Sequence, residues 1–178
     1  IASLALVTID NPMCAGTGHR ICNDCMKGCI FQKQEPVNIP LAETHTLTDV
    51  LNLPYGFEIY NLLTRWNPLN AKRPFALPYN GKNVLVVGLG PAGYTLAHYL
   101  LNEGFGVIGV DSLKIEPLPD EWTGKTGKET PKPIKNIEEI TDELDERILS
   151  GFGGVSEYGI TVRWDKNFLT MMQLMLSR

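Results

Sequence analysis

Residues 83–111 read NVLVVGLGPAGYTLAHYLLNEGFGVIGVD and carry the clearest indication of fold class in the chain. The β-branched run at 83–87 predicts a fully buried strand, and 107–110 predict a second strand. A helix is expected between them over 91–102, ending at Gly104, because glycine tolerates the left-handed backbone of a helix end. Strand, helix and strand in this order predict a βαβ unit and therefore an α/β fold.

The loop between the first strand and the helix carries the pattern G-x-G-x-x-G, formed by Gly88, Gly90 and Gly93. Gly88 permits a tight turn, Gly90 lets the backbone approach a pyrophosphate, and Gly93 lets the helix pack closely on the strand. Pro91 and Ala92 open the helix, whose N-terminus offers N–H groups and a positive dipole to phosphates. Asp111 ends the second strand, where it is placed to accept hydrogen bonds from an adenosine ribose.

The surrounding strand, helix, second strand and acidic residue make this glycine pattern more specific than it is alone. An acidic residue at the end of the second strand disfavours a 2′-phosphate, so the site suits FAD or NAD better than NADP. The spacing does not choose between FAD and NAD. The alternative is a glycine-rich turn in an α/β domain that binds no nucleotide.

The four cysteines of the chain lie within sixteen residues, in the pattern C-x7-C-x2-C-x3-C: Cys14, Cys22, Cys25 and Cys29. Four thiolates this close can surround one metal centre. Three crowded cysteines with a fourth upstream favour a [4Fe–4S] cluster, whereas zinc sites more often show two separated C-x2-C pairs. Zinc ligation and free redox cysteines remain the alternatives.

Residues 1–66 are expected to form a small helical domain built on this cysteine cluster. A short strand is predicted within 1–10, because Val7 and Ile9 alternate with other residues. The sequence at Thr46 resembles a capping box and predicts the start of a short helix that ends before Pro54. A second helix is predicted over 57–66, with its apolar residues on one face.

Residues 67–82 contain three prolines and an Asn-Gly pair, which predicts a linker. Residues 83–178 are expected to form a partial Rossmann-like FAD-binding domain with an insertion at 112–150. Within it, 112–136 predict a polar surface excursion, and 137–149 predict an acidic amphipathic helix.

The chain has 178 residues, 43% of them hydrophobic, and a net charge of −4, so we expect a packed core and no nucleic-acid partner. No apolar run approaches the about 20 residues needed to cross a bilayer. The opening residues lack the basic region of a signal peptide, which favours a reducing, cytoplasmic compartment. The chain begins at Ile1 and ends after a helix-like stretch, which suggests a fragment of a longer protein.

In this order, the cysteine cluster, helical part, linker and VLVVGLGPAGYTLA segment resemble the small (β) subunit of NADPH-dependent glutamate synthase and its relatives. These are FAD-dependent pyridine nucleotide oxidoreductases with an N-terminal iron–sulfur domain. The segment GGVSEYGITVRWDKN at 153–167 resembles a stretch that follows the second strand in this family. By this resemblance Gly153 and Gly154 would lie near the flavin, and Arg163 would belong to the same motif. The first cysteine spacing is wider than the family pattern, so Cys14 departs most from it.

The resemblance implies that NAD(P)H, bound by a domain absent from this chain, would give a hydride to FAD. Electrons would then pass singly through iron–sulfur centres to a partner. That partner would be the remainder of the same polypeptide, a large glutamate synthase-type subunit or another redox protein. No residue forms a pattern that we would assign as a catalytic acid or base, and this fragment alone is not expected to turn over. The rival interpretation is a zinc-stapled interaction module fused to an NAD-binding Rossmann domain.

Overall fold

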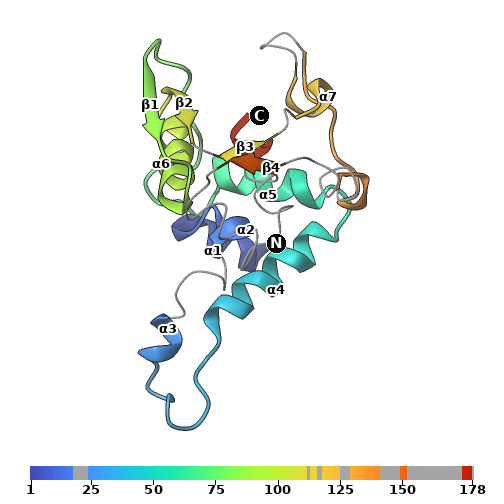
Figure 1. Cartoon of the computed structure of the whole chain (residues 1–178). Helices are drawn as coiled ribbons and strands as arrows, with labels where there is room; N and C mark the ends of the chain where they lie inside the picture. The colour runs from blue at the N-terminus through green and yellow to red at the C-terminus, as the bar shows by residue number, and fades with distance from the viewer. Residues whose placement is uncertain are drawn as a thin grey trace.

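The computed structural model describes residues 1–17, 24–111, 113–115, 118–124, 129–140, 149–151 and 174–177. Ahead of the first strand it contains α1 (Ala2–Asp10), α2 (Cys14–Thr17), α3 (Asp24–Lys27), α4 (Ile39–Leu51) and α5 (Gly56–Arg65) (Figure 1). There follow β1 (Asn83–Val87), α6 (Pro91–Asn102), β2 (Gly106–Val110), β3 (Leu113–Ile115), α7 (Asp120–Thr123) and β4 (Leu149–Gly151).

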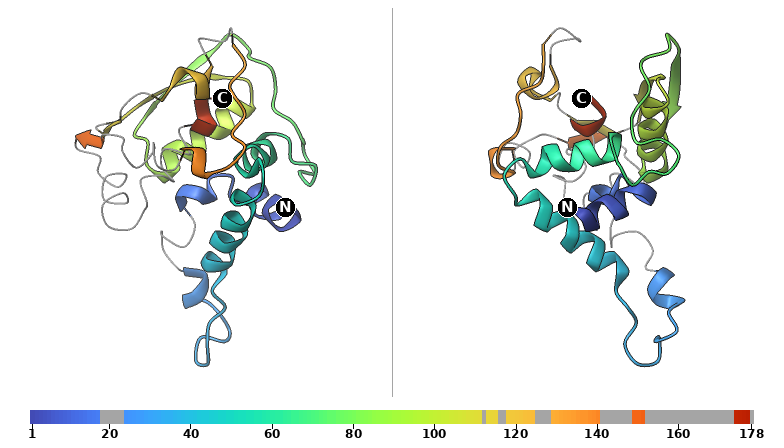
Figure 2. Two further views of the ribbon diagram at one scale, coloured as in Figure 1. Left: turned by 90° about the vertical axis from the view of Figure 1, so that its right-hand side faces the viewer. Right: turned by 180° about the vertical axis from the view of Figure 1, so that it is seen from behind.

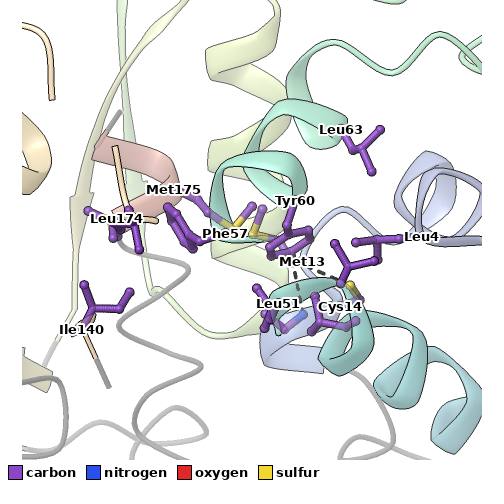
Figure 3. Close-up of a cluster of buried hydrophobic side chains, with 14 of the residues drawn as sticks. Leu4, Met13, Cys14, Leu51, Phe57, Tyr60, Leu63, Ile140, Leu174 and Met175 are labelled. Atoms are coloured by element: carbon purple, nitrogen blue, oxygen red, sulfur yellow. Dashed lines mark hydrogen bonds between the residues drawn. The ribbon is translucent and has the colours of Figure 1, made fainter. Parts of the chain in front are cut away.

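The core lies where α1, α4 and α5 pack together. α5 buries Phe57, Tyr60 and Leu63, which recur at the spacing of one helix face. Figure 3 shows these side chains beside Leu4 and Met13 from the N-terminal segment. A Cβ at Gly56 would lie 2.1 Å from the Val50 carbonyl oxygen, so the close approach of α4 and α5 requires glycine there.

The predicted strand in residues 1–10 is wrong, because this segment forms the helix α1. Leu4, Ala5 and Thr8 are buried at helical spacing, and the face they form packs on α4 and α5. The buried Asn67 side chain holds α1 in place by donating to the Ala5 carbonyl at 2.7 Å and to the Thr8 hydroxyl at 3.1 Å.

The predicted start of the next helix at Thr46 is also wrong, because Thr46 lies inside α4. This helix begins at Ile39, where the Asn38 side chain accepts a hydrogen bond from the Leu41 N–H at 3.0 Å. The predictions of its end before Pro54 and of a helix near 57–66 agree with α4 and α5.

The βαβ unit is confirmed: β1 and β2 are parallel neighbours, paired from Asn83↔Gly106 to Val87↔Val110, and α6 connects them. α6 ends as predicted before Gly104, which has φ +81°. The prediction that β1 is fully buried is wrong. Val86 points towards α6 and is buried, whereas Leu85 and Val87 are exposed, because α6 covers one face of the sheet only.

The linker at 67–82 packs along the C-terminal end of α6. Leu77 N–H donates to the Asn102 carbonyl at 2.8 Å, and Asn80 N–H donates to the Gly104 carbonyl at 2.7 Å. Arg73 adds an ion pair with Glu103. These contacts attach the helical part to the βαβ unit.

The insertion at 112–150 is less polar than predicted. Trp122 of α7 and Ile134 are buried and belong to the same hydrophobic cluster as α1, α4 and α5. β3 and β4 pair antiparallel, from Leu113↔Gly151 to Ile115↔Leu149. Leu149 is therefore in a strand and not at the end of the predicted acidic helix, while 141–148 lie outside the described residues.

A helix both long and apolar enough to cross a membrane does not occur in the parts of the chain that the structure describes.

Candidate functional site

The glycine loop leaves β1 through a backbone conformation that requires glycine. Gly88 has φ +94°, in the left-handed region that L side chains rarely adopt. Its N–H donates to the Val110 carbonyl at 2.8 Å, so the loop begins at the shared carboxyl edge of β1 and β2. This edge is where ligands bind in open parallel sheets.

The third glycine allows the tightest contact in the βαβ unit. A Cβ at Gly93 would lie 1.9 Å from the Gly88 carbonyl oxygen and 3.7 Å from a methyl group of Val86. Any side chain at position 93 would therefore push α6 away from the loop and β1. This is the helix–strand contact that the glycine pattern predicts.

The N-terminus of α6 has no side-chain cap. Gly90 is the N-cap residue in an extended conformation, and no side chain caps the helix. Pro91 occupies the first turn, where its missing N–H costs nothing. The first N–H groups of a twelve-residue helix thus lie beside the glycine loop, an arrangement suited to phosphate oxygens.

Asp111 lies beside the glycine loop, as the pattern predicts. Its carboxylate accepts a hydrogen bond from the Leu89 N–H, which ties the loop to the end of β2. Gly88, Gly90, Pro91, Ala92, Gly93 and Asp111 are therefore brought together at one edge of the βαβ unit. The described residues thus place a helix N-terminus without a side-chain cap beside a carboxylate. Gly153, Gly154 and Arg163 lie outside the described residues.

Cys14 is buried in the core, where it contacts Tyr60 (Figure 3). Its thiol donates to the Tyr60 hydroxyl at 3.7 Å, and that hydroxyl donates to the Pro12 carbonyl at 2.7 Å. The Ala15 N–H also donates to Tyr60, at 3.3 Å. Burial raises the pKa of the Cys14 thiol to about 12, so Cys14 is protonated at neutral pH.

Cys25 and Cys29 lie in a different part of the molecule. α3 and the residues that follow it project beyond the N-terminal end of α4, away from α2 (Figures 1 and 2). Cys25 is exposed, and the partly exposed Cys29 sulfur accepts a hydrogen bond from the Phe31 N–H at 3.4 Å. Cys22 lies outside the described residues.

The described arrangement does not fit a single metal site that includes Cys14. Within the described ranges, no three His, Cys, Asp or Glu side chains are grouped as metal ligands would be. Ligation by Cys14 would require its thiol to leave Tyr60 and the core. Tyr60 was not singled out by the sequence, because it is separated from Cys14 by 46 residues and no local pattern joins them.

A polar cavity of about 420 Å³ lies between α1, α5, the linker and α6. Two of its arginines already bind protein groups, since Arg73 pairs with Glu103 and Arg65 donates to the Met175 carbonyl. The buried His98 lines the same cavity, where burial and the positive charge of Arg65 lower its pKa to about 4. The Arg73–Glu103 pair joins the linker to the end of α6, and the Arg65 bond joins α5 to Met175, so we assign them a structural role.

No family model matches the chain, and no solved structure matches it. The chain is 55% identical, over 166 residues, to an uncharacterized protein of Rickettsia prowazekii (strain Madrid E). The match covers 93% of this chain and 22% of that protein, so the chain spans about a fifth of its relative's length.

Proposed function

We propose that the chain is the FAD-binding and cysteine-bearing part of an FAD-dependent NAD(P)H oxidoreductase similar to the glutamate synthase small subunit. The observation that carries this proposal is the glycine loop. Gly93 lies against Gly88, and the Asp111 carboxylate holds the Leu89 N–H at the edge where α6 begins. FAD is preferred to NAD because of the family resemblance of the VLVVGLGPAGYTLA segment.

The residues of this chain would bind and orient the cofactor. The N–H groups at the start of α6 would hold the pyrophosphate, and the close approach permitted by Gly88 and Gly90 would admit it. Asp111 would accept hydrogen bonds from the adenosine ribose. When bound, FAD supplies the hydride and electron chemistry, which lies outside the side chains named here. We assign no catalytic acid or base.

An iron–sulfur cluster remains part of the proposal; the spacing predicts Cys14, Cys22, Cys25 and Cys29 as its ligands, and of these Cys14 departs most from the family pattern. Cys14 belonged to the predicted set, but its place beside Tyr60 does not fit the cluster, and we derive no electron-transfer step through one. We propose a cytoplasmic, reducing compartment from the clustered cysteines and the lack of a basic signal-peptide region in the opening residues.

Partners are proposed from the length of the relative. Because the chain spans about a fifth of the R. prowazekii protein, the NAD(P)H-binding part would lie elsewhere in a longer polypeptide of that kind. A large glutamate synthase-type subunit or another redox protein would be the next electron acceptor.

The proposal is tested by titrating anaerobically purified protein with FAD and, separately, with NAD. Binding of FAD is followed by the change in flavin fluorescence, and the nucleotide released from each protein sample is identified. The same sample is assayed for iron, zinc and acid-labile sulfide. FAD binding that is weakened by Asp111→Asn, but not by Asp49→Asn on the surface of α4, would support the site. A colourless protein that binds NAD and one zinc ion would establish the interaction-module interpretation instead.

A further inference from the structure

The polar cavity between α1, α5, the linker and α6 lies at the opposite end of α6 from the glycine loop. Its volume of about 420 Å³ falls within the range of pockets that bind small molecules. From α6 it is lined by His98, Tyr99 and Asn102, which belong to the last turns of this helix. Gly90, at the start of the twelve-residue helix, lies about 18 Å from Asn102 along the axis. The cavity is therefore separate from the candidate nucleotide site.

The charges around this cavity do not balance. Arg65, Lys72 and Arg73 contribute three positive charges, whereas Glu103 is the single carboxylate among the described residues that line it. His98 is neutral at neutral pH, because burial and the Arg65 charge lower its pKa to about 4. The salt bridge between Arg73 and Glu103 uses one charge of each sign, so Arg65 and Lys72 remain as an excess of two positive charges.

Arg65 is the group that most requires an anion. Its Nη2 donates to the Met175 carbonyl, and its buried Nε has no hydrogen-bond partner within the described ranges. In that part of the chain, no carboxylate forms an ion pair with Arg65. Burial lowers the pKa of the Arg65 guanidinium, which still stays protonated at neutral pH. A charge partly removed from water without a counter-charge costs free energy, and a bound anion would offset this cost.

Two further donors line the cavity with Arg65. The Lys72 ammonium and the Tyr99 hydroxyl make no hydrogen bond to the residues that the structure describes. Burial and the charge of Asp10 raise the pKa of Tyr99, so its hydroxyl stays protonated and able to donate. The groups available to a ligand are therefore donors and cations, which favour an anion rich in acceptor oxygens.

The remaining walls are partly apolar and are held by protein contacts. Ile9, Leu63 and Phe75 line the cavity beside its polar groups, so the organic part of a ligand would have apolar surface to contact. The Asn102 side chain joins α6 to α5, because it donates to the Thr64 carbonyl at 3.2 Å. A site held in shape before the ligand enters loses less free energy on binding.

We propose that this cavity binds a small organic phosphate, a phosphate monoester, with Arg65, Lys72 and Tyr99 as its donors. A phosphate monoester carries about −1.5 to −2 charge near neutral pH, which matches the excess of two positive charges within one small cavity. Arg65 suits this group because a guanidinium binds phosphate oxygens through parallel N–H bonds. The inference stands on the cavity and its charges, and it does not depend on FAD binding at the glycine loop.

The experiment measures binding to the 178-residue chain by isothermal titration calorimetry. Neutral pH and low ionic strength are used, because salt screens the interactions of exposed charges. The probe is ribose 5-phosphate, compared with ribose, inorganic phosphate and succinate. We expect ribose 5-phosphate to bind, inorganic phosphate and succinate to bind about tenfold more weakly or less, and ribose to show no measurable binding.

Two lysines of the linker provide matched variants. Lys72 and Lys82 are both exposed, but only Lys72 lines the cavity. Neither Lys72→Gln nor Lys82→Gln should disturb folding, because both side chains reach solvent. Lys72→Gln should weaken the binding of ribose 5-phosphate about tenfold by removing one positive charge, whereas Lys82→Gln should leave the affinity unchanged.

The histidine ring signals locate the bound probe without any substitution at the cavity. His98 lines the cavity, whereas His45 lies exposed on α4. Ribose 5-phosphate should move the His98 signals in a proton–carbon NMR spectrum and leave the His45 signals in place.

Four results would overturn the proposal. One is the absence of ribose 5-phosphate binding. Another is inorganic phosphate binding as tightly as ribose 5-phosphate, which would indicate an adventitious ion only. The third is ribose or succinate binding as tightly, because the phosphate monoester would then not be what the site selects. The fourth is equal affinity in Lys72→Gln and Lys82→Gln, or His98 signals that do not move, because the probe would then bind elsewhere on the chain. Failure of the FAD titration without any of these results would count against the proposed function alone.

Discussion

Replacing Gly93 with alanine adds a single methyl group at the contact between the glycine loop and α6. The new carbon would lie 1.9 Å from the Gly88 carbonyl oxygen, where an ordinary contact begins at 3.4 Å. The obstructing atom belongs to the backbone, so no side chain can turn aside. The helix must move by roughly 1.5 Å, and in a close-packed unit this displaces the loop and Val86 as well.

The size of the effect follows from two opposing terms. Overpacking of this kind costs about 1–3 kcal/mol, and a backbone obstacle places it at the upper end. Against this, alanine stabilises a helix by about 1 kcal/mol relative to glycine. We therefore expect the free energy of unfolding to fall by about 2 kcal/mol. With a denaturant slope of about 2 kcal/mol/M, the urea midpoint falls by about 1 M.

The assay is urea unfolding followed by circular dichroism, with Gly28→Ala as the matched control. A Cβ at Gly28 would meet its nearest atom, the Asp24 carbonyl oxygen, at the ordinary distance of 3.4 Å, so that midpoint should hardly change. The FAD titration is repeated on the folded variant, where displacement of the α6 N-terminus should weaken binding. A Gly93→Ala midpoint equal to that of the parent would show that the contact between Gly93 and the Gly88 carbonyl does not limit the size of this residue.

Four further predictions concern single side chains. Cys14→Ala should cost about 1–2 kcal/mol of stability through the small cavity and the lost Tyr60 contact, yet leave the iron content of anaerobically purified protein unchanged. Cys25→Ala should lower that iron content, and equal losses in both variants would contradict the separation of Cys14 from the metal site. His98 has a folded pKa of about 4, against an ordinary value of 6.5, so the unfolded chain takes up this proton first as the pH falls. The neutral His98 ring therefore contributes fully to the free energy of unfolding above pH 6.5, and this contribution, on the order of 3 kcal/mol in all, is lost as the pH falls towards 4. Urea midpoints measured across this pH range should depend less on pH in His98→Gln than in the parent. An unchanged pH dependence would disprove the assignment. Asp111→Asn should weaken FAD binding about tenfold by removing a charged acceptor, with a stability change below about 1 kcal/mol; an unchanged affinity in the flavin titration would show that the carboxylate does not contact the ribose.

The βαβ unit could be predicted from the sequence because its determinants are local. The apolar run of β1, the glycines and the left-handed Gly104 lie within a short stretch, and each limits the backbone at its own position. The exposure of Leu85 and Val87 could not be predicted in this way. The apolar composition of a strand tells which residues favour burial, but burial itself depends on what packs against the second face.

The N-terminal part was harder to predict because tertiary packing decides it. Val7 and Ile9 favour a strand, yet α1 forms because Leu4 and Ala5 are buried against the other helices, which outweighs local propensity. The sequence does contain a signal for the start of α4, because Asn38 can cap the helix and a proline lies in its first turn. The capping-box pattern at Thr46 is the stronger of the two sequence signals and predicts a later start.

The candidate site likewise has one part that spacing along the chain indicates and one part that depends on tertiary packing. The glycine loop and Asp111 were singled out by their spacing, and their role as a nucleotide site stays a prediction; the structure shows that the Asp111 carboxylate accepts a hydrogen bond from the Leu89 N–H of this loop. The environment of Cys14 was not found, because spacing along the chain treats all four cysteines as equivalent. Only the fold shows that one of them packs against a tyrosine contributed by a distant helix.

The Tyr60 hydroxyl has a consequence for how the cysteine segment can vary. It fixes the backbone at Pro12 and Ala15, while the Asn38 cap fixes the chain again where α4 begins. The stretch between them contains α3 and includes residues 18–23, which lie outside the described residues; it is held at one end by the core and at the other by the exposed Asn38 cap. Loop-closure entropy grows slowly, by about 0.6 kcal/mol for each doubling of length. Insertions and deletions between these two anchors should be tolerated by the fold, so cysteine spacing can change there while the helices around Tyr60 stay the same.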